Sequence, residues 1–303
     1  MPDPDRSDTP VCDVSVVIPA YRAEATIAAT LRSVFAQTLK PREIVIVDDG
    51  SDDGTLAAIE SVRDESPGIA LHVLQQENRG AGAARNAAIA HARATYIAFI
   101  DADDVWLPAK LERSMHHIET TGVTLSAHDY FDVTPAGEVH VDCVRRFNEP
   151  PDPYTSLYIK GYIPSCSVVA ERDAISRIGG FDESLRNAQD FELWLRLLRQ
   201  PGVRFEVFGE PLLKYHHSPG GIMSFTERRL TCCTRIAVMH YDAIRARARR
   251  PLGVLLQRLA AIHVEAFRSY TGRGMYAAAL GLIASALVRI PKALLAAHRR
   301  NSN

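Results

Sequence analysis

The residues with the clearest chemical potential are three aspartates within four positions, in the sequence Asp101-Ala102-Asp103-Asp104. They follow an apolar run, YIAFI, at residues 96–100. Neighbouring carboxylates repel one another, so the cluster costs stability unless a cation or hydrogen-bond donors offset its charge. Oxygen ligands of this kind suit Mg²⁺ or Mn²⁺, which often share their coordination with substrate phosphates. The alternative is that the aspartates cap the helix that Pro108 opens, where the helix dipole favours acids.

A second polar segment, DDGSDDGT at residues 48–55, follows another apolar run, EIVIV at 43–47. Its glycines allow the backbone to approach a ligand, and a carboxylate there can accept from a base N–H or a ribose hydroxyl. We assign that contact to Asp49, while Asp52 or Asp53 caps the next helix. There is no G-x-G-x-x-G after the first strand and no Walker A sequence, which disfavours dinucleotide oxidoreductases and P-loop NTPases.

Strands and helices alternate through the first hundred residues and must position these segments. Short β-branched runs predict strands, and apolar residues at helical spacing predict the helices between them. The predicted strands are 14–18, 43–47, 71–74 and 96–100, and the predicted helices are 24–37, 56–63 and 81–92. This alternation indicates an α/β fold with a mostly parallel sheet flanked by helices. Because ligands bind at the carboxyl ends of such strands, we expect the polar segments to meet there.

The second half of the chain is less regular. We expect helices over 108–120 and 190–199, and strands over 123–131 and 165–170. The five cysteines show no C-x-x-C spacing, which argues against a disulfide framework or a zinc site and fits a reducing cytoplasm. The acidic, Pro-rich start is not a signal peptide, and residues 1–12 are expected to be a disordered lead-in.

Charge is distributed unevenly along the chain. From Arg228 to the end there are 14 Lys and Arg against two acids, which gives +12, while the total of -1 leaves -13 for the rest. A basic end suggests contact with an anionic partner such as a membrane surface. Residues 276–297 are apolar and nearly long enough to span a bilayer, but Arg289, Pro291 and Lys292 interrupt them. We favour an interfacial amphipathic helix pair over a spanning helix.

Six sequence segments occur in a specific order: VVIPAY (16–21), VDDGSDDGT (47–55), NRGAGAARN (78–86), IDADD (100–104), GGFDE (179–183) and DFELW (190–194), followed by a Tyr/His/Ser segment at 213–224. Together they resemble the inverting family 2 glycosyltransferases of the GT-A, Rossmann-like fold. The resemblance covers about residues 14–225. It implies a GT-A domain at 13–225 and a helical, basic C-terminal extension at 226–303.

The resemblance implies a role for each matching residue of the nucleotide-sugar site. Pro19, Ala20 and Tyr21 would form the nucleotide pocket together with Asp49. Arg85 would face the nucleotide or its phosphates, although a surface charge on a helix is the alternative.

The same resemblance implies the metal site and the catalytic base. Asp101-Ala102-Asp103 matches the Asp-X-Asp motif, so Asp101 and Ala102 would contact the nucleotide sugar. Asp103 would be the direct ligand of Mg²⁺ or Mn²⁺, with Asp101 and His216 close to the metal. Asp190 matches the catalytic base, although many members have Glu-Asp where this chain has Gln189-Asp190. A helix cap is the alternative role of Asp190.

The implied reaction is metal-dependent transfer, with inversion, of a sugar from a nucleoside diphosphate donor to a hydroxyl of a glycan or lipid-linked acceptor. Its setting would be the synthesis of cell-surface or extracellular polysaccharide. We expect a cytoplasmic protein held at the inner face of the cell membrane by its basic helices, with no nucleic-acid partner. Two alternatives remain: a catalytically silent glycan-binding or scaffold protein, and a sugar-nucleotide pyrophosphorylase, which needs a Gly-rich loop that Pro19-Ala20-Tyr21-Arg22 does not provide.

Overall fold

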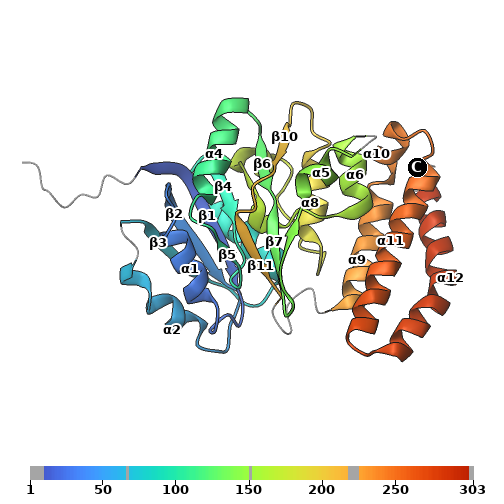
Figure 1. Ribbon diagram of the computed structural model, residues 1–303, viewed down its shortest axis with the longest axis horizontal. Coiled ribbons are helices and arrows are strands. Elements are labelled where there is room, and N and C mark those ends of the chain that lie inside the picture. The colour runs from blue at the N-terminus through green and yellow to red at the C-terminus, as the bar shows by residue number, and fades with distance from the viewer. Residues whose placement is uncertain (1–9, 66–67, 150–151, 218–224, 300–303) are drawn as a thin grey trace, which may run out of the picture. The chain divides into compact units, whose positions relative to one another are not determined.

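The computed structural model describes residues 10–65, 68–149, 152–217 and 225–299. The chain divides into two compact units (Figure 1). The first unit comprises Met1–Val144, Pro164–Phe181 and Gly202–His217. The second comprises Arg145–Ile163, Asp182–Pro201 and Ser218–Asn303.

A seven-stranded sheet forms the centre of the first unit, in the order β10-β6-β9-β4-β1-β2-β3. Neighbouring strands are parallel except at β9, which is antiparallel to both β4 and β6. The strands are β1 (Val11–Ala20), β2 (Lys40–Asp48), β3 (Ala70–Gln75), β4 (Tyr96–Phe99), β6 (Leu125–His128), β9 (Val169–Glu171) and β10 (Phe205–Phe208). The mostly parallel α/β sheet predicted from the sequence is confirmed.

Helices cover the sheet because its strands are apolar toward both faces. Val16 and Ile18 of β1 pack in one cluster with Leu31 of α1 (Ile27–Phe35) and Leu111 of α4 (Lys110–Thr121). The small residues of α3 (Ala81–His91) let this helix pack closely against β1 and β2. Each fully buried aliphatic side chain contributes about 1.5–3 kcal/mol. The unit also contains α2 (Thr55–Glu60), α7 (Arg172–Arg177), η1 (Arg63–Glu65) and η2 (Ser165–Ser167).

A second, four-stranded sheet in the first unit has the order β5-β11-β7-β8. Its strands are β5 (Val105–Trp106), β7 (Tyr130–Thr134), β8 (Gly137–Val141) and β11 (Leu213–His216). Because β11 pairs antiparallel with β5, residues more than a hundred positions apart become neighbours. The aspartate cluster that precedes β5 therefore lies beside the end of β11.

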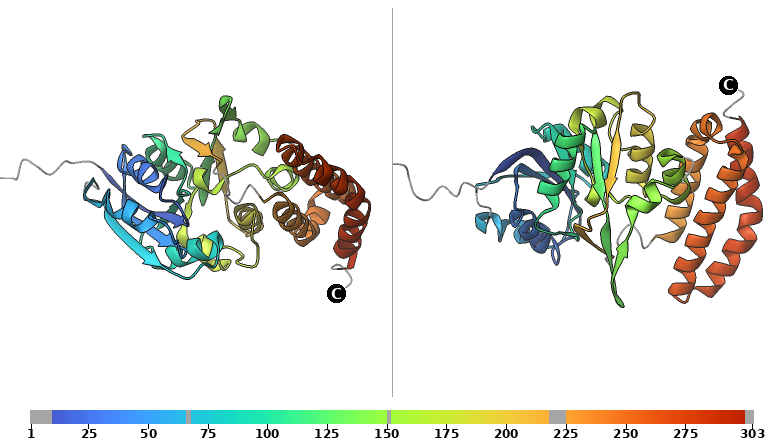
Figure 2. Two further views of the ribbon diagram at one scale, coloured as in Figure 1. Left: turned by 90° about the horizontal axis from the view of Figure 1, so that it is seen from below. Right: turned by 45° about the horizontal axis from the view of Figure 1, so that its top comes forward.

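The second unit is helical. Its helices are α6 (Pro153–Lys160), α8 (Gln189–Leu197), α9 (Thr226–Met239), α10 (Tyr241–Arg247), α11 (Pro251–Gly272) and α12 (Tyr276–Arg299), while α5 (Cys143–Phe147) runs from the first unit into the second. The long helices α9, α11 and α12 lie side by side in all views (Figure 2). One described helix, α12, is long and apolar enough to cross a membrane, with a mean hydropathy of 1.7 over its most apolar window.

Two predicted boundaries differ from the structure. Val11 and Cys12, assigned to the disordered lead-in, belong to β1, where they pair with Lys40 and Pro41 of β2. The division of the chain also does not follow the predicted boundary at residue 225, because the second unit includes α6 and α8. Polar contacts join these helices to the C-terminal ones: the Tyr158 hydroxyl of α6 donates to the carbonyl of Ala237, 2.8 Å away.

Two predicted strands also differ. The segment 123–131 forms two strands in different sheets, β6 and β7, with Asp129 between them. In the segment 165–170, a 3₁₀ turn at Ser165–Ser167 precedes the short strand β9. The other two segments of the second half match the predicted helices, as α4 and α8.

Lys110, the first residue of α4, is a fully buried lysine. Its Nζ lies 4.1 Å from the centroid of the Trp106 ring and 3.5 Å from the carbonyl oxygen of Val168. Burial lowers the pKa of Lys110 from 10.5 to about 7. Between these two pH values the unfolded chain binds more protons than the folded one. The destabilising effect of this lysine is therefore complete below pH 7 and disappears as the pH rises toward 10.5.

We predict that Lys110→Met, which keeps an unbranched side chain, raises the free energy of unfolding by roughly 3 kcal/mol near pH 7. The gain should shrink above pH 7 and vanish near pH 10.5. Urea unfolding across this range measures both effects. The control is Lys292→Met at an exposed position of α12, which should give one small difference at every pH. A gain for Lys110→Met that did not change with pH would contradict the prediction.

Candidate functional site

The carboxyl ends of three adjacent parallel strands bring the predicted segments of the first unit together. Strands β4, β1 and β2 are neighbours, and Ala20 at the end of β1 pairs with Asp48 at the end of β2. The backbone N–H of Asp49 donates to the carbonyl of Ala20 at 2.8 Å. The Asp101–Asp104 turn follows β4 at the same edge. The predicted convergence at the strand ends is what the structure shows.

The loop after β1 combines buried and exposed residues. Pro19 and Ala20 are buried, whereas the Tyr21 ring is exposed and lies 5.3 Å from the guanidinium carbon of Arg22. Arg22 has a φ of 50°, and its guanidinium binds the two carboxylate oxygens of Asp52 at 2.6 and 2.7 Å. Arg22 and Ala188 are the two non-glycine residues with positive φ in the described chain. Such strained residues are concentrated at functional sites.

Asp49 lies where it was predicted, but its carboxylate contacts the protein itself. Its side chain is buried, and Oδ1 accepts from Gln76 Nε2 at 2.7 Å and from the N–H of Arg79 at 2.9 Å. Oδ2 accepts from the N–H of Gly80 at 2.8 Å. The observed function of Asp49 is therefore to hold the loop that leads into α3. Its nucleotide contact remains a proposal, since each carboxylate oxygen can accept a further hydrogen bond.

Arg85 is not a surface charge. It is buried on α3, and its Nη2 lies 2.5 Å from Oδ1 of Asp101. The guanidinium carbon is 5.4 Å from the Phe181 ring centroid. The neighbouring Asn86 fixes this ring, because its side chain accepts from the N–H of Phe181 at 2.8 Å and donates to the Phe181 carbonyl at 3.0 Å. A Cβ at Gly180, where φ is +68°, would collide with the Asn86 side chain. This explains why the second position of the GGFDE segment is a glycine.

Asp104 is not the cap of α4, and the cap interpretation of the aspartate cluster is wrong for this residue. Strand β5 separates Asp104 from α4, whose N-cap residue is Ala109. The Asp104 side chain is fully buried, and its Oδ1 accepts from the N–H of His216 at 2.8 Å. Burial, together with the carboxylates of Asp101 and Asp103, raises the pKa of Asp104 well above its usual range.

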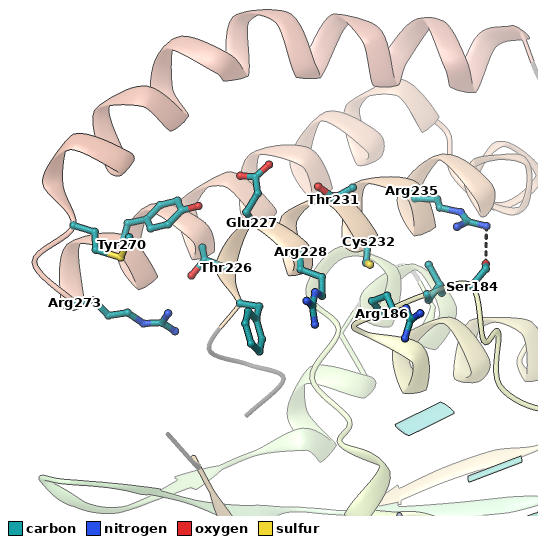
Figure 3. A pocket seen from close by; sticks show the side chains of 13 residues that line it. Ser184, Arg186, Thr226, Glu227, Arg228, Thr231, Cys232, Arg235, Tyr270 and Arg273 are labelled. Carbon is teal, nitrogen blue, oxygen red and sulfur yellow. Dashed lines mark hydrogen bonds between the residues drawn. The ribbon is translucent and has the colours of Figure 1, made fainter. Parts of the chain in front are cut away.

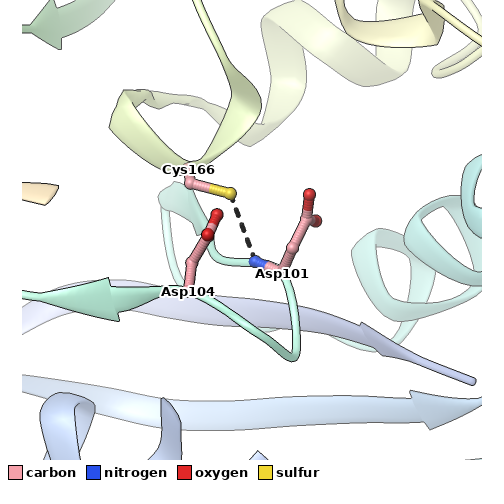
Figure 4. Close-up of side chains that lie close together, drawn as sticks. All are labelled: Asp101, Asp104 and Cys166. Atoms are coloured by element: carbon pink, nitrogen blue, oxygen red, sulfur yellow. Dashed lines mark hydrogen bonds between the residues drawn. The ribbon is translucent and has the colours of Figure 1, made fainter. Parts of the chain in front are cut away.

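Asp101, Asp104 and Cys166 form the group of potential metal ligands within the described residues, with their ligand atoms all within 4.8 Å of one another (Figure 4). Cys166 is buried in η2, and its sulfur accepts from the N–H of Asp101 at 3.2 Å. Burial and the two carboxylates raise the pKa of the Cys166 thiol well above its usual range. A protonated thiol is a poor metal ligand, so the carboxylate oxygens determine which kind of metal ion this site suits.

The residues fit a hard divalent cation. Oδ2 of Asp104 and Nδ1 of His216 are buried and have no hydrogen-bond partner among the described residues. Asp103, half-buried in the same turn, adds to the negative charge around Asp104. A cation would offset this charge, and both atoms are potential ligands. Asp103 and His216 lie outside the 4.8 Å group, so their binding of the metal remains a proposal.

In the second unit, Asp190 lies in the first turn of α8. The N-cap of this helix is Ala188, with φ of 56°, rather than Asp190. Oδ1 of Asp190 accepts from the N–H of Phe191 at 2.8 Å. Gln189, which stands where many family members have glutamate, is buried and donates to the Leu185 carbonyl at 2.6 Å. Asp190 thus accepts one first-turn N–H, and its negative charge also acts on Arg229 of α9.

Sequence reasoning missed three residues that position the site: Gln76, Asn86 and Cys166. Gln76 binds Asp49, Asn86 holds Phe181, and Cys166 accepts from Asp101. Asn86 lies within the NRGAGAARN segment, so its sequence context was a usable signal. Trp106 and Trp194 are buried core residues whose indole N–H groups donate to backbone carbonyls.

Residues 15–176 match the family model described as Glycosyl transferase family 2. The chain is 32% identical over 188 residues to the UDP-Glc:alpha-D-GlcNAc-diphosphoundecaprenol beta-1,3-glucosyltransferase WfaP of Escherichia coli, which covers 61% of this chain and 70% of that protein. It is also 32% identical over 190 residues to the putative teichuronic acid biosynthesis glycosyltransferase TuaG of Bacillus subtilis, covering 62% and 72% of the two chains.

Solved structures show the same fold. The structure of S. aureus TarS 1-349 in complex with UDP-GlcNAc has a TM-score of 0.64 at 21% identity and covers 82% of this chain and 72% of that one. The mannosyltransferase PcManGT from Pyrobaculum calidifontis, in complex with GDP-Man and Mn²⁺, has a TM-score of 0.62 at 22% identity, covering 95% and 86%.

Proposed function

Since the chain belongs to glycosyl transferase family 2 and is a glycosyltransferase of glycan biosynthesis, we propose that it moves a sugar from a nucleoside diphosphate donor to a hydroxyl of a lipid-linked glycan. The single observation that carries the proposal is the buried carboxyl group of Asp104 beside Asp101 at the strand ends, with its Oδ2 lacking a hydrogen-bond partner among the described residues. A bound divalent cation would supply the positive charge that favours the ionised form of this carboxyl group and would share its coordination with a diphosphate. The family membership also disfavours the pyrophosphorylase alternative.

The donor would bind to the first unit. The exposed Tyr21 ring offers a stacking surface for the base beside Pro19 and Ala20. Arg85, fixed between Asp101 and Phe181, holds a positive charge at the phosphate side.

The metal would be held by Asp101, Asp103 and His216, with Asp104 orienting the end of β11 through its bond to the His216 N–H. When bound, Mg²⁺ or Mn²⁺ supplies Lewis-acid stabilisation of the leaving diphosphate. PcManGT, which contains Mn²⁺ and GDP-Man, supports this assignment for the shared fold.

The acceptor hydroxyl attacks the anomeric carbon on the side opposite the diphosphate, which inverts that centre. The new bond joins the acceptor oxygen to the anomeric carbon, and the bond from that carbon to the diphosphate oxygen breaks. Asp190 takes the hydroxyl proton as general base. The diphosphate leaves with the electron pair of the broken bond.

The C-terminal helices would hold the enzyme at an anionic membrane surface, where lipid-linked acceptors are found. The supporting observation is the charge of +12 from Arg228 to the end, combined with the apolar α12. Each Lys or Arg near such a surface contributes about 1 kcal/mol. The names of two Escherichia coli relatives specify a diphosphoundecaprenol-linked acceptor, which supports the same location.

Metal-dependent donor binding is the direct test of the donor assignment. UDP-glucose with Mn²⁺ should raise the midpoint of thermal unfolding of the full chain by about 2–5 °C, because a ligand that binds only the folded state stabilises it. UDP-glucose with EDTA should give little shift, and Mn²⁺ alone sets the baseline. Other nucleotide sugars, including GDP-mannose, form the rest of the screen. Absence of a metal-dependent shift with every donor would overturn the proposed donor site.

A further inference from the structure

The second unit contains a pocket that the proposed donor site does not use (Figure 3). Its volume is ≈ 670 Å³, and its walls come from the start of α9, the loop before α8 and the turn between α11 and α12. Four arginines line it against one glutamate, which gives a lining charge of +3, and one of the four, Arg235, also forms an ion pair of 3.9 Å with Asp182 outside the lining. The arginines are Arg186, Arg228, Arg235 and Arg273.

The single acid of the pocket does not cancel this charge. Glu227 forms an ion pair of 2.7 Å with Arg289 of α12, and in Figure 3 it points away from Arg228. Arg228 is exposed, forms no ion pair with another described residue, and lies over the Phe225 ring at 4.4 Å. Arg228 therefore lines the pocket with a planar guanidinium of five N–H donors, a group that suits phosphate oxygens.

The start of α9 adds donors to the same pocket. This helix of 14 residues begins at Thr226, and no side chain caps it, since its N-cap residue is Phe225. The first N–H groups of a helix have no partner within it, and the helix dipole places positive charge at this end. Both effects favour the same kind of ligand as the arginines, an anion with several oxygens.

An apolar surface continues from the rim of the pocket. Met275 lines the pocket and is exposed, and Tyr276, Leu280, Ile283 and Leu287 follow it along α12. Their spacing places them on one face of the helix, and Leu287 is 80% exposed. Such a face, continuous with a basic pocket, matches an amphiphile with an anionic head and a hydrocarbon tail.

We propose that this pocket binds the diphosphate of the lipid-linked acceptor, with the lipid chain along the exposed face of α12. The proposal rests on the proposed function, and it adds a second phosphate site, separate from the one for the donor. The arginines and the α9 N-terminus would contact the diphosphate oxygens. Binding here would anchor the acceptor by its invariable lipid diphosphate and leave the sugar end free.

Vesicle binding by the full chain tests the proposal. The vesicles are phosphatidylcholine alone, phosphatidylcholine with a polyprenyl diphosphate, or phosphatidylcholine with phosphatidylglycerol at equal surface charge. The wild type should bind the diphosphate vesicles most tightly, and R186Q/R228Q should weaken this binding about tenfold or more, because two charge-assisted contacts are lost. The matched control is R245Q/R249Q, which removes the same charge at exposed positions of the same unit outside the pocket.

If both double variants weakened binding to the diphosphate vesicles equally, the proposed diphosphate pocket would be wrong and the effect would be one of net charge. Inorganic pyrophosphate in solution separates the two sources of the ligand: if it raises the thermal stability of the wild type as much as the lipid-linked diphosphate does, the lipid assignment is overturned. Asp103→Asn should bind the diphosphate vesicles like the wild type, so a failed donor site and a failed acceptor pocket give different results. The phosphatidylglycerol vesicles also test the proposed membrane location.

Discussion

Asp190→Asn is expected to lower kcat for sugar transfer about 10³-fold while leaving donor binding unchanged. Asparagine keeps the shape of the side chain, and its carbonyl oxygen can still accept from the N–H of Phe191. The change removes the ability to take a proton from the acceptor hydroxyl, together with the negative charge that acts on Arg229. General-base catalysis contributes about 10²–10⁴ to enzymatic rates. Transfer rates and the metal-dependent thermal shift with the donor, measured on the same preparation, separate catalysis from folding and binding.

Asp173→Asn is the matched control for this experiment. Asp173 also lies in the first turn of a helix, α7, and is exposed. Asp173→Asn therefore makes the same substitution at a residue outside the proposed catalytic site. Unchanged transfer by Asp190→Asn would assign the proton to another group and leave Asp190 as a structural residue of α8. Complete inactivity of the wild type with every donor and acceptor would instead favour the silent-scaffold alternative.

The sequence predicts well what local patterns determine. Strands β1, β2, β3 and β4 follow from short β-branched runs, and their parallel order places Ala20, Asp48 and Asp101 at one edge. Conformations that depend on the surroundings are less predictable. Ala188 adopts a left-handed φ at the start of α8, although nothing in its residue type indicates it.

Contacts between distant segments explain what the sequence could not predict. Asp104 looked like a cap because acids are common before helices, but β11, more than a hundred residues later, buries it under the His216 N–H. Asp49 looked like a free ligand because its partners, the N–H groups of Arg79 and Gly80, come from another loop. The second unit assembles for the same reason, since the pairing of Tyr154 with His240 at 2.9 Å joins α6 to the end of α9.

Asp103→Asn is the second change with a large expected effect. Asparagine keeps the size of the side chain but removes the negative charge that a hard divalent cation requires from its ligand. Loss of Lewis-acid stabilisation is worth several kcal/mol, so transfer should fall about 10²–10³-fold. Unlike Asp190→Asn, this variant should also lose the metal-dependent thermal shift with the donor, because the metal and the diphosphate bind together.

The structure gives Asp103→Asn a sharper second readout through Asp104. The Asp103 carboxylate is one of the two charges that raise the pKa of Asp104, after burial. In the metal-free protein, removing the Asp103 charge relieves its repulsion with Asp104. Asp103→Asn should therefore be slightly more stable than the wild type when EDTA is present. Asp64→Asn in η1, an exposed aspartate, should change neither stability nor transfer. A variant that kept its metal-dependent donor shift would exclude Asp103 as a metal ligand. If Asp103→Asn were less stable than the wild type in EDTA, the Asp103 carboxylate would stabilise the fold without a metal instead of destabilising it by repulsion.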